Sequence, residues 1–275
     1  MTDAPLVQTR QTTSEYGILS GPRALRLDRV PASPDLATLV ERHWLVSWDL
    51  PPGRRDPVTL LPHPCVNLVH DRGMVAVAGV GSERFTYLQE GAGRVFGVKF
   101  RPGGFHPFLR GPVSALTDQT VPLRWPGAAQ LAAELTSAPD LPALVEVAER
   151  YLRANWPEED LEVERVGKIV HALLYDRTIT RVDEICARFD LAPRTLQRLF
   201  QRYVGVTPKW VLRRYRLHEA AARLAEGTTG TWAEVAVDLG YFDQPHFIRD
   251  FTRAVGMTPA AYAEACTRHE APLST

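Results

Sequence analysis

The chain is poor in cysteine and in long apolar runs, and each shortage excludes a class of protein. Its 275 residues contain three cysteines, an odd number without regular spacing, which argues against a disulfide-bonded secreted fold. No stretch approaches about eighteen consecutive apolar residues, and the polar first fifteen residues lack the apolar core of a signal peptide. We therefore expect a cytoplasmic protein without a membrane partner.

Sequence motifs of catalysis are lacking as well. The chain has no phosphate-binding glycine loop, zincin pattern or nucleophile elbow, and Gly79, Gly81, Gly91 and Gly93 are typical of hairpin turns. We expect no enzymatic activity, no catalytic residue, no cofactor and no metal.

Net charge is lacking too, because 32 basic residues balance 32 acidic ones. The average conceals a basic segment, residues 191–217, which contains no acidic residue. Such a local patch is a more useful indicator of a nucleic-acid partner than the total charge. Its basic residues are Arg194, Arg198, Arg202, Lys209, Arg213, Arg214 and Arg216.

The last third of the chain contains one apolar pattern twice, about fifty residues apart. In both copies four residues at positions i, i+3, i+4 and i+7 form one face of a short helix. A second amphipathic run follows, and the copies end on Gly205-Val206-Thr207-Pro208 and Gly256-Met257-Thr258-Pro259. This repeat predicts two helix-turn-helix units, which indicates a double-stranded DNA partner. The four-residue sets are Val182, Ile185, Cys186 and Phe189, and then Trp232, Val235, Ala236 and Leu239.

The second helix of the first unit has the residues that base recognition requires. Pro193 suits its first turn, and a helical period places Arg194, Gln197, Arg198 and Gln201 on the face opposite the apolar residues. Arginine pairs bidentately with guanine, and glutamine with adenine, in the major groove. Thr195 belongs to the same expected interface, and Arg202 and Arg213 are expected to contact phosphates.

The second unit offers a weaker recognition helix, because Asp250 and Ile248 interrupt its polar face. Its expected DNA contacts are Gln244, His246, Arg249 and Arg253. A continuous helical pattern over residues 208–226 joins the units and would span about 27 Å. One chain would then reach two adjacent major grooves of an asymmetric operator.

Residues 17–126 contain short runs rich in valine, leucine and aromatic residues, bounded by proline and glycine, which predict strands. The expected strands are 43–50, 65–70, 74–80 and 94–101, and helices follow at 127–136 and 141–155. We predict an α+β protein with a small β-barrel or cupin-like domain at residues 1–158 and an all-α domain at 159–275. The expected helix-turn-helix units occupy about 181–204 and 231–255.

Residues 165–268 resemble the DNA-binding domain of the AraC/XylS transcriptional regulators. The resemblance rests on Ile185-Cys186-Ala187, on Leu196-Gln197-Arg198-Leu199-Phe200, on residues 240–251 (GYFDQPHFIRDF) and on residues 256–262. It implies base contacts at Arg194, Gln197 and Arg198, and then at Gln244 and Arg249. Pro245 and Ile248 depart from the polar residues common in the family, so the resemblance supports base contacts by the second helix less strongly.

The resemblance also implies an N-terminal domain that binds a small-molecule effector or forms a homodimer. Residues 61–68 and 97–104 are similar to a divergent N-terminal domain of some actinobacterial members. An activator would in addition contact RNA polymerase. The candidate effector pocket consists of Trp44, Trp48, His63, Cys65, Phe96 and Phe100.

Two alternatives remain open at this point. The first is a thiol- or metal-dependent enzyme or sensor centred on His63 and Cys65, two residues apart on one expected strand, with the C-terminal helices directing it to DNA. The second is an effector-independent regulator that dimerises through the apolar stripe of residues 141–152.

Overall fold

The computed structural model describes residues 18–20, 25–176, 178–227 and 232–270. The chain forms two compact units, of which one is Ser20–Tyr215 and the other contains residues 216–270. The division falls inside one long helix, α7 (Pro208–Ala225). The first helix-turn-helix unit therefore lies in the same compact unit as the strands between Arg26 and Pro122.

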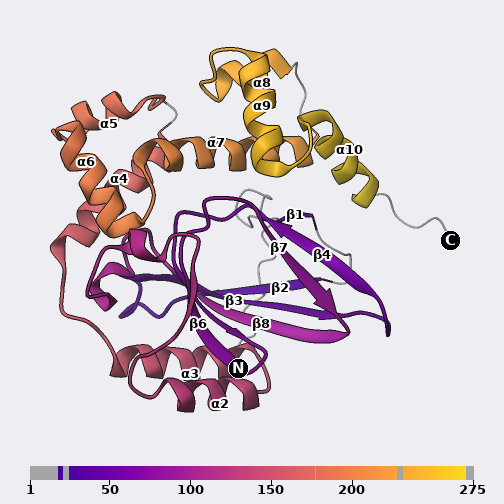
Figure 1. Cartoon of the computed structure of the whole chain (residues 1–275), viewed down its shortest axis with the longest axis vertical. Helices are drawn as coiled ribbons and strands as arrows, with labels where there is room; N and C mark the ends of the chain where they lie inside the picture. The colour runs from indigo at the N-terminus through magenta and orange to yellow at the C-terminus, as the bar shows by residue number, and fades with distance from the viewer. Residues whose placement is uncertain (1–17, 21–24, 177, 228–231, 271–275) are drawn as a thin grey trace, which may run out of the picture. The chain divides into compact units, whose positions relative to one another are not determined.

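An antiparallel six-stranded sheet is the framework of Ser20–Tyr215 (Figure 1). Its strands follow the order β2-β3-β8-β5-β6-β9, and a smaller sheet contains the antiparallel pair β4 and β7. The strands are β1 (Ile18–Ser20), β2 (Arg26–Pro31), β3 (Val40–Asp49), β4 (Arg55–Leu60), β5 (Asn67–Asp71), β6 (Met74–Ala78), β7 (Phe85–Glu90), β8 (Ala92–Phe100) and β9 (Thr120–Pro122).

The expected α+β class is confirmed, but the expected closed barrel is wrong. The sheet is open, with β2 and β9 at its two edges. Alternation of apolar and polar residues indicates a sheet with one buried face, and it does not distinguish an open sheet from a closed one. The strands β1, β2, β4, β7 and β9 were not predicted either.

Two tryptophans set the close packing between β3 and β8. Trp44 is paired with Gly97, and Trp48 with Gly93. A Cβ atom on Gly97 would lie 2.2 Å from the Trp44 indole, and one on Gly93 would lie 2.4 Å from the Trp48 indole. Each indole therefore covers a position that only glycine can occupy.

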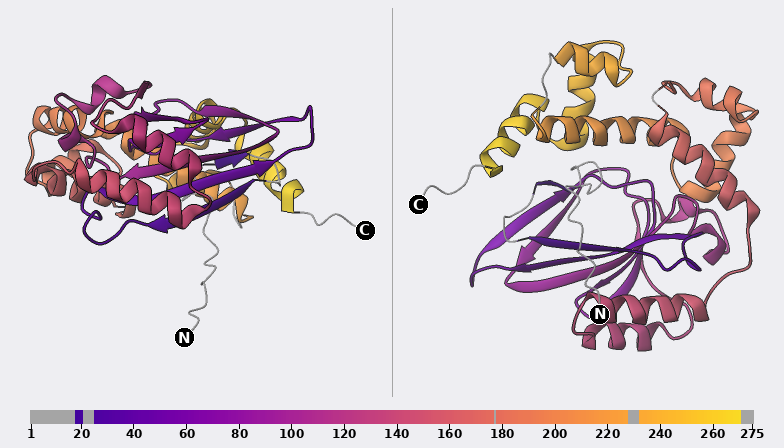
Figure 2. Two further views of the ribbon diagram at one scale, coloured as in Figure 1. Left: turned by 90° about the horizontal axis from the view of Figure 1, so that it is seen from below. Right: turned by 180° about the vertical axis from the view of Figure 1, so that it is seen from behind.

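Two helices, α2 (Ala128–Ser137) and α3 (Leu141–Ala154), cover the face of the large sheet opposite Trp44 and Trp48 (Figures 1 and 2). The Asp140 side chain caps α3 by accepting a hydrogen bond from the Ala143 amide over 3.0 Å. Leu144, Ala148 and Leu152 are buried in the core against this face of the sheet. The apolar stripe of residues 141–152 thus packs within the chain and is not free to form a dimer surface.

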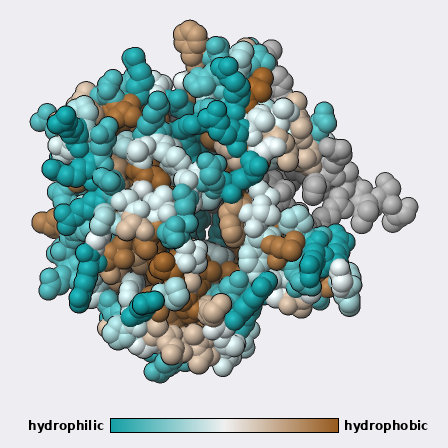
Figure 3. Space-filling view, viewed as in Figure 1, coloured by the Kyte–Doolittle hydropathy of each residue, from teal (hydrophilic) through white to brown (hydrophobic). Residues whose placement is uncertain are grey.

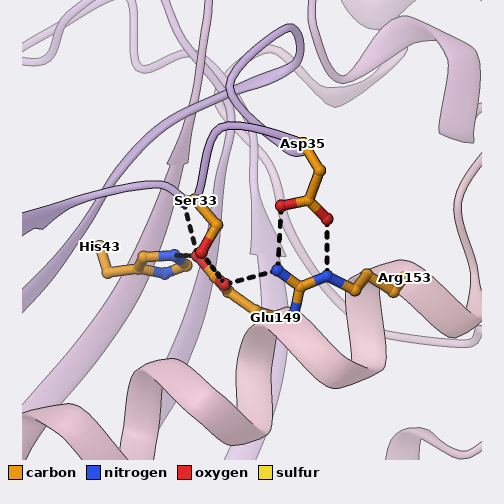
Figure 4. A network of polar contacts seen from close by, with 5 residues as sticks. All are labelled: Ser33, Asp35, His43, Glu149 and Arg153. Carbon is orange, nitrogen blue, oxygen red and sulfur yellow. Dashed lines mark hydrogen bonds and ion pairs between the residues drawn. The ribbon is translucent and has the colours of Figure 1, made fainter.

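A buried carboxylate joins α3 to the sheet (Figure 4). Glu149 accepts hydrogen bonds from the amide and the hydroxyl of Ser33, at 2.9 and 2.5 Å, and lies 3.1 Å from Nε2 of His43. Arg153 bridges Glu149 to Asp35, with 2.9 Å to the former and 2.7 Å to the latter. Because Glu149 is 4% exposed and His43 is 0% exposed, these partners are what make burial of the charge tolerable.

The remaining elements are helical or short turns, and the described part of the chain contains no helix long and apolar enough to cross a membrane. They are η1 (His106–Phe108), η2 (Val113–Leu116), α4 (Leu161–Tyr175), α5 (Val182–Arg188), α6 (Pro193–Leu199), η3 (Phe200–Val204), α7, α8 (Trp232–Asp238), α9 (Gln244–Val255) and α10 (Pro259–Glu270).

Candidate nucleic-acid interface

The first helix-turn-helix unit consists of α5, α6 and the single π-helical turn η3 that continues α6. Glu184 fixes the start of α5, because its carboxylate accepts hydrogen bonds from the amides of Thr180 and Arg181, at 2.5 and 2.9 Å. Pro193 opens α6, where its missing amide hydrogen costs nothing. Gly205 ends η3 in the left-handed conformation, with φ at 92°.

The helix α6 buries one face and exposes the other. Leu196 and Phe200 are both 0% exposed and pack with α4 and α5 in one core. The polar residues lie on the opposite side, and in Figure 3 the region of α5 and α6 is mainly hydrophilic. Arg194, Gln197, Arg198, Gln201 and Arg202 are exposed, and Thr195 is half-buried.

A chain of hydrogen bonds orients Arg202. Its Nε donates to Nε2 of His106 over 3.1 Å, and Nδ1 of the same imidazole lies 3.2 Å from Asp160. A neutral imidazole with its proton on Nδ1 satisfies both contacts. Burial, reinforced by the charge of Arg202, lowers the pKa of His106 and favours this neutral form, although Asp160 opposes the shift.

Asp160 also holds the recognition helix through Tyr203. The Tyr203 hydroxyl donates to the Asp160 carboxylate over 3.0 Å, and the tyrosine ring lies 4.1 Å from that of His106. The same carboxylate caps α4 by accepting from the Glu162 amide over 3.1 Å. One acidic residue therefore connects α4, η3 and the turn η1.

The arginines of α7 differ in their surroundings. Arg213 is half-buried. Arg214 is 4% exposed, donates to the Ser82 carbonyl over 2.5 Å and stacks on the Trp210 ring at 4.4 Å. Burial lowers the pKa of Arg214 to about 10, and the guanidinium stays charged at neutral pH. Part of the basic segment thus serves the packing of α7.

The second helix-turn-helix unit consists of α8 and α9. Asp243 caps α9 by accepting from the His246 amide over 2.7 Å. Phe247 and Phe251 are 0% exposed. Of the four expected contacts His246, Arg249 and Arg253 are exposed, and Gln244 is half-buried.

Two residues of this unit differ from what the spacing suggested. Asp250, expected to interrupt the polar face, is 8% exposed and lies 3.8 Å from the His246 imidazole, so its charge is withdrawn from the surface. Phe242 is 92% exposed directly before the cap of α9. Sequence reasoning missed Phe242, because an aromatic residue beside the apolar Tyr241 looks like a core residue.

The aromatic residues of the candidate effector pocket lie on both faces of the large sheet. On paired strands, Phe96 shares a face with Leu45, whereas Trp44 and Trp48 point to the other face. Phe96 and Phe100 belong to the core under α2 and α3, and Trp48 packs in a separate cluster with Leu50 and Val95. The interior barrel surface on which the set depended does not exist in an open sheet.

His63 and Cys65 lie in the segment that precedes β5. Cys65 is buried, and burial raises the pKa of its thiol. Its sulfur lies 3.8 Å from the side-chain amide of Asn67. Within the residues that the structure describes, no group of three or more histidine, cysteine or acidic side chains is placed to hold a metal.

Two family models match separate parts of the chain. Residues 28–122 match a domain of unknown function (DUF6597), and residues 185–265 match a helix-turn-helix domain. The second range contains α6 and α9 with their exposed polar faces.

Curated relatives match a part of the chain. The uncharacterized HTH-type transcriptional regulator YidL of Escherichia coli (strain K12) is 31% identical over 113 residues, which is 41% of this chain and 37% of the relative. The HTH-type transcriptional activator RhaR of Yersinia pseudotuberculosis is 32% identical over 85 residues, 31% of this chain and 29% of the relative. The chain thus spans about a third of the length of these relatives.

Solved structures match the chain with low TM-scores. The DNA-binding domain of AdpA, in complex with a target DNA, is 28% identical and covers 38% of this chain and 94% of its own, with a TM-score of 0.34. ToxT from Vibrio cholerae O395 is 10% identical and covers 90% of this chain and 99% of its own, with a TM-score of 0.41. Neither score reaches 0.5, so neither likeness bears on the arrangement of the helices described above. The C-terminal part of the chain thus contains a helix-turn-helix domain that follows a domain of unknown function, and the curated relatives are HTH-type transcriptional regulators.

Proposed function

We propose that the chain is a sequence-specific transcriptional regulator whose helix α6 reads bases in a major groove. The observation that carries this proposal is the exposed face of Arg194, Gln197, Arg198 and Gln201 on a helix whose opposite face is fully buried. These side chains match the hydrogen-bonding edges of guanine and adenine. The Arg202 and Arg213 side chains contact phosphates and set the position of the helix.

The second unit supplies fewer base contacts. In α9, Pro245 and Ile248 have side chains that cannot donate a hydrogen bond to a base. Arg249 and Arg253 are exposed, and their charge suits contacts to phosphates. The 18 residues of α7 span about 27 Å, which is close to the separation of adjacent major grooves once the helix diameters are added. Since the two units differ in sequence, the operator is asymmetric.

The N-terminal residues 1–158 regulate the C-terminal residues 159–275 by binding a small-molecule effector or by forming a homodimer. The resemblance to AraC/XylS regulators supports this division of roles. Because its partner is chromosomal DNA, the protein acts in the cytoplasm, and as an activator it would contact RNA polymerase there. We infer no enzymatic activity for it.

Selection of binding sites from a random duplex library by the full chain tests this function. We expect enrichment of one asymmetric sequence in which the half bound by α6 is strongly constrained and the other half weakly so. Failure to enrich any sequence, with binding that does not exceed that to bulk DNA, would contradict the proposal. A palindromic consensus would show instead that two chains each use one unit.

A further inference from the structure

A cleft of about 620 Å³ lies beside the recognition helix, within the unit Ser20–Tyr215. One wall is formed by Arg198, Gln201 and Arg202 of the helix, and the other by the segment Leu109–Pro112 that connects η1 to η2. His106 also lines the cleft. The cleft therefore joins the surface proposed to read DNA to a loop of the N-terminal part.

The cleft is strongly basic. Arg110 stands on one wall and Arg198 and Arg202 on the other, and all three are exposed. Within the described part of the chain, no carboxylate forms an ion pair with any of them. Three guanidinium groups that form no ion pair among the described residues create a positive potential that favours an anion between the walls, while the Asp160 carboxylate lies on the far side of His106.

The hydrogen bond to His106 holds the Arg202 side chain in an orientation that suits binding of such an anion. Nε of its guanidinium donates to the imidazole, and among the residues that the structure describes no partner takes either terminal nitrogen. Because the Asp160 contact fixes the imidazole from the other side, Arg202 loses little side-chain freedom when it binds. The backbone phosphates of DNA are anions that arginine recognises with this geometry.

The open character of the cleft indicates which anion it takes. Small-molecule sites bury most of their ligand, whereas four of the eight residues that line this cleft are exposed and carry long polar side chains. Arg198 and Gln201 also belong to the proposed base-reading face, so the cleft opens where the border of a major groove would lie. A phosphodiester strand follows that border.

Resting on the proposed function of α6, we propose that this cleft holds one DNA backbone strand and that Arg110 of the N-terminal part contacts a phosphate. The N-terminal domain then adds directly to the DNA interface, in addition to any regulatory role. The contact carries no sequence information, because a phosphate is the same at each position.

The test compares the salt dependence of DNA binding for the full chain and for Arg110→Ala. Loss of one phosphate contact should reduce the slope of log K against log salt by about 0.9 and weaken binding up to about eightfold at 0.1 M salt, for all sequences alike. Arg110→Lys, which keeps the charge, should retain the slope. Arg124→Ala, which removes an exposed arginine outside the cleft, should bind as the parent does.

Each contrary result is distinguishable from failure of the proposed function. If the parent chain binds no specific DNA, the function of α6 is wrong. If the parent binds specifically and Arg110→Ala keeps its slope, only the cleft proposal is overturned. Titration with pyrophosphate tests whether the cleft binds a small anion in place of DNA. If pyrophosphate binding requires Arg110 while Arg110→Ala leaves the salt slope of DNA binding unchanged, the cleft is a small-anion site and the proposal is overturned.

Discussion

The Nε atom of Arg202 donates a hydrogen bond over 3.1 Å to the imidazole of His106, which lies 96 residues earlier in the chain. This contact joins the recognition helix of the first helix-turn-helix unit to a turn of the N-terminal part. The same compact unit therefore contains both the helix proposed to read DNA and the sheet of the domain of unknown function. The hydrogen bond therefore connects that domain to the helix that is proposed to bind DNA.

Substitution of Arg198 should change both affinity and sequence preference. Arg198→Ala removes one bidentate contact to a base and should cost about 1 to 3 kcal/mol of binding free energy on the selected operator. The measurement is fluorescence anisotropy on the operator and on its single-base variants, with Arg124→Ala as the control for loss of one positive charge. An Arg198→Ala variant as tight and as selective as the parent would show that this side chain points away from the bases.

Acid should destabilise the unit Ser20–Tyr215 through His43. Burial lowers the pKa of His43 below its usual 6.5, although Glu149 opposes the shift. The folded state then binds fewer protons than the unfolded state, so the stabilisation is complete above about pH 6.5 and is lost as the pH falls through the folded pKa. Urea unfolding at several pH values between 8 and 5 should show a stability that declines toward acid.

The variant His43→Gln isolates the contribution of His43 to this pH dependence. In His43→Gln the decline between pH 6.5 and 5 should be smaller than in the parent, because the imidazole no longer titrates. The control His171→Gln replaces an exposed histidine and should leave the decline unchanged. Equal pH profiles for the parent and His43→Gln would assign the acid sensitivity to other groups.

Glycine at position 205 should be required for packing of the recognition helix. Its φ of 92° costs an L residue about 1 to 2 kcal/mol, and a Cβ atom would also lie 3.1 Å from the Thr117 hydroxyl and from a methyl group of Val113. Gly53→Ala is the matched control, because Gly53 has φ at 78° and a Cβ atom there would meet no other atom within 4 Å. Thermal unfolding should show Gly205→Ala less stable than Gly53→Ala. Equal losses of stability in the two variants would mean that Thr117 and Val113 shift to accommodate the added Cβ atom without destabilising the fold.

The thiol of Cys65 should resist alkylation in the folded protein. Its burial both blocks access and raises its pKa, which keeps the thiol protonated. Mass spectrometry after treatment with iodoacetamide should find Cys65 modified only after denaturation, and half-buried Cys266 modified earlier. Rapid modification of native Cys65 would restore the thiol-dependent alternative.

The helices of the two helix-turn-helix units were predictable because each has a local signal. The apolar spacing of Leu196 and Phe200, with proline at the first turn and glycine at the end, follows from propensity and period alone. In the same way, the tryptophans of β3 revealed a strand. The strands β4 and β7 lack such a signal: Pro57 and exposed Phe85 and Leu88 break the alternation, and only their pairing makes them a sheet.

The candidate site residues also differ in whether a local sequence signal predicts them. The exposed face of α6 follows from one helix period, so residues from Arg194 to Arg202 could be named in advance. His106, Arg110 and Asp160 could not, because their relation to Arg202 depends on chain segments more than forty residues away.

The amino-acid sequence by itself determined the repeated helix-turn-helix pattern, the basic segment and the face of α6 that meets solvent, because these depend on neighbours within one or two helical turns. The tertiary structure decided that the sheet is open, that Trp44 and Phe96 lie on opposite faces of it, and that a loop of the N-terminal part stands beside Arg202. Strand pairing and packing bring together residues whose separation along the chain carries no periodic signal, and only the folded chain settles which of them meet.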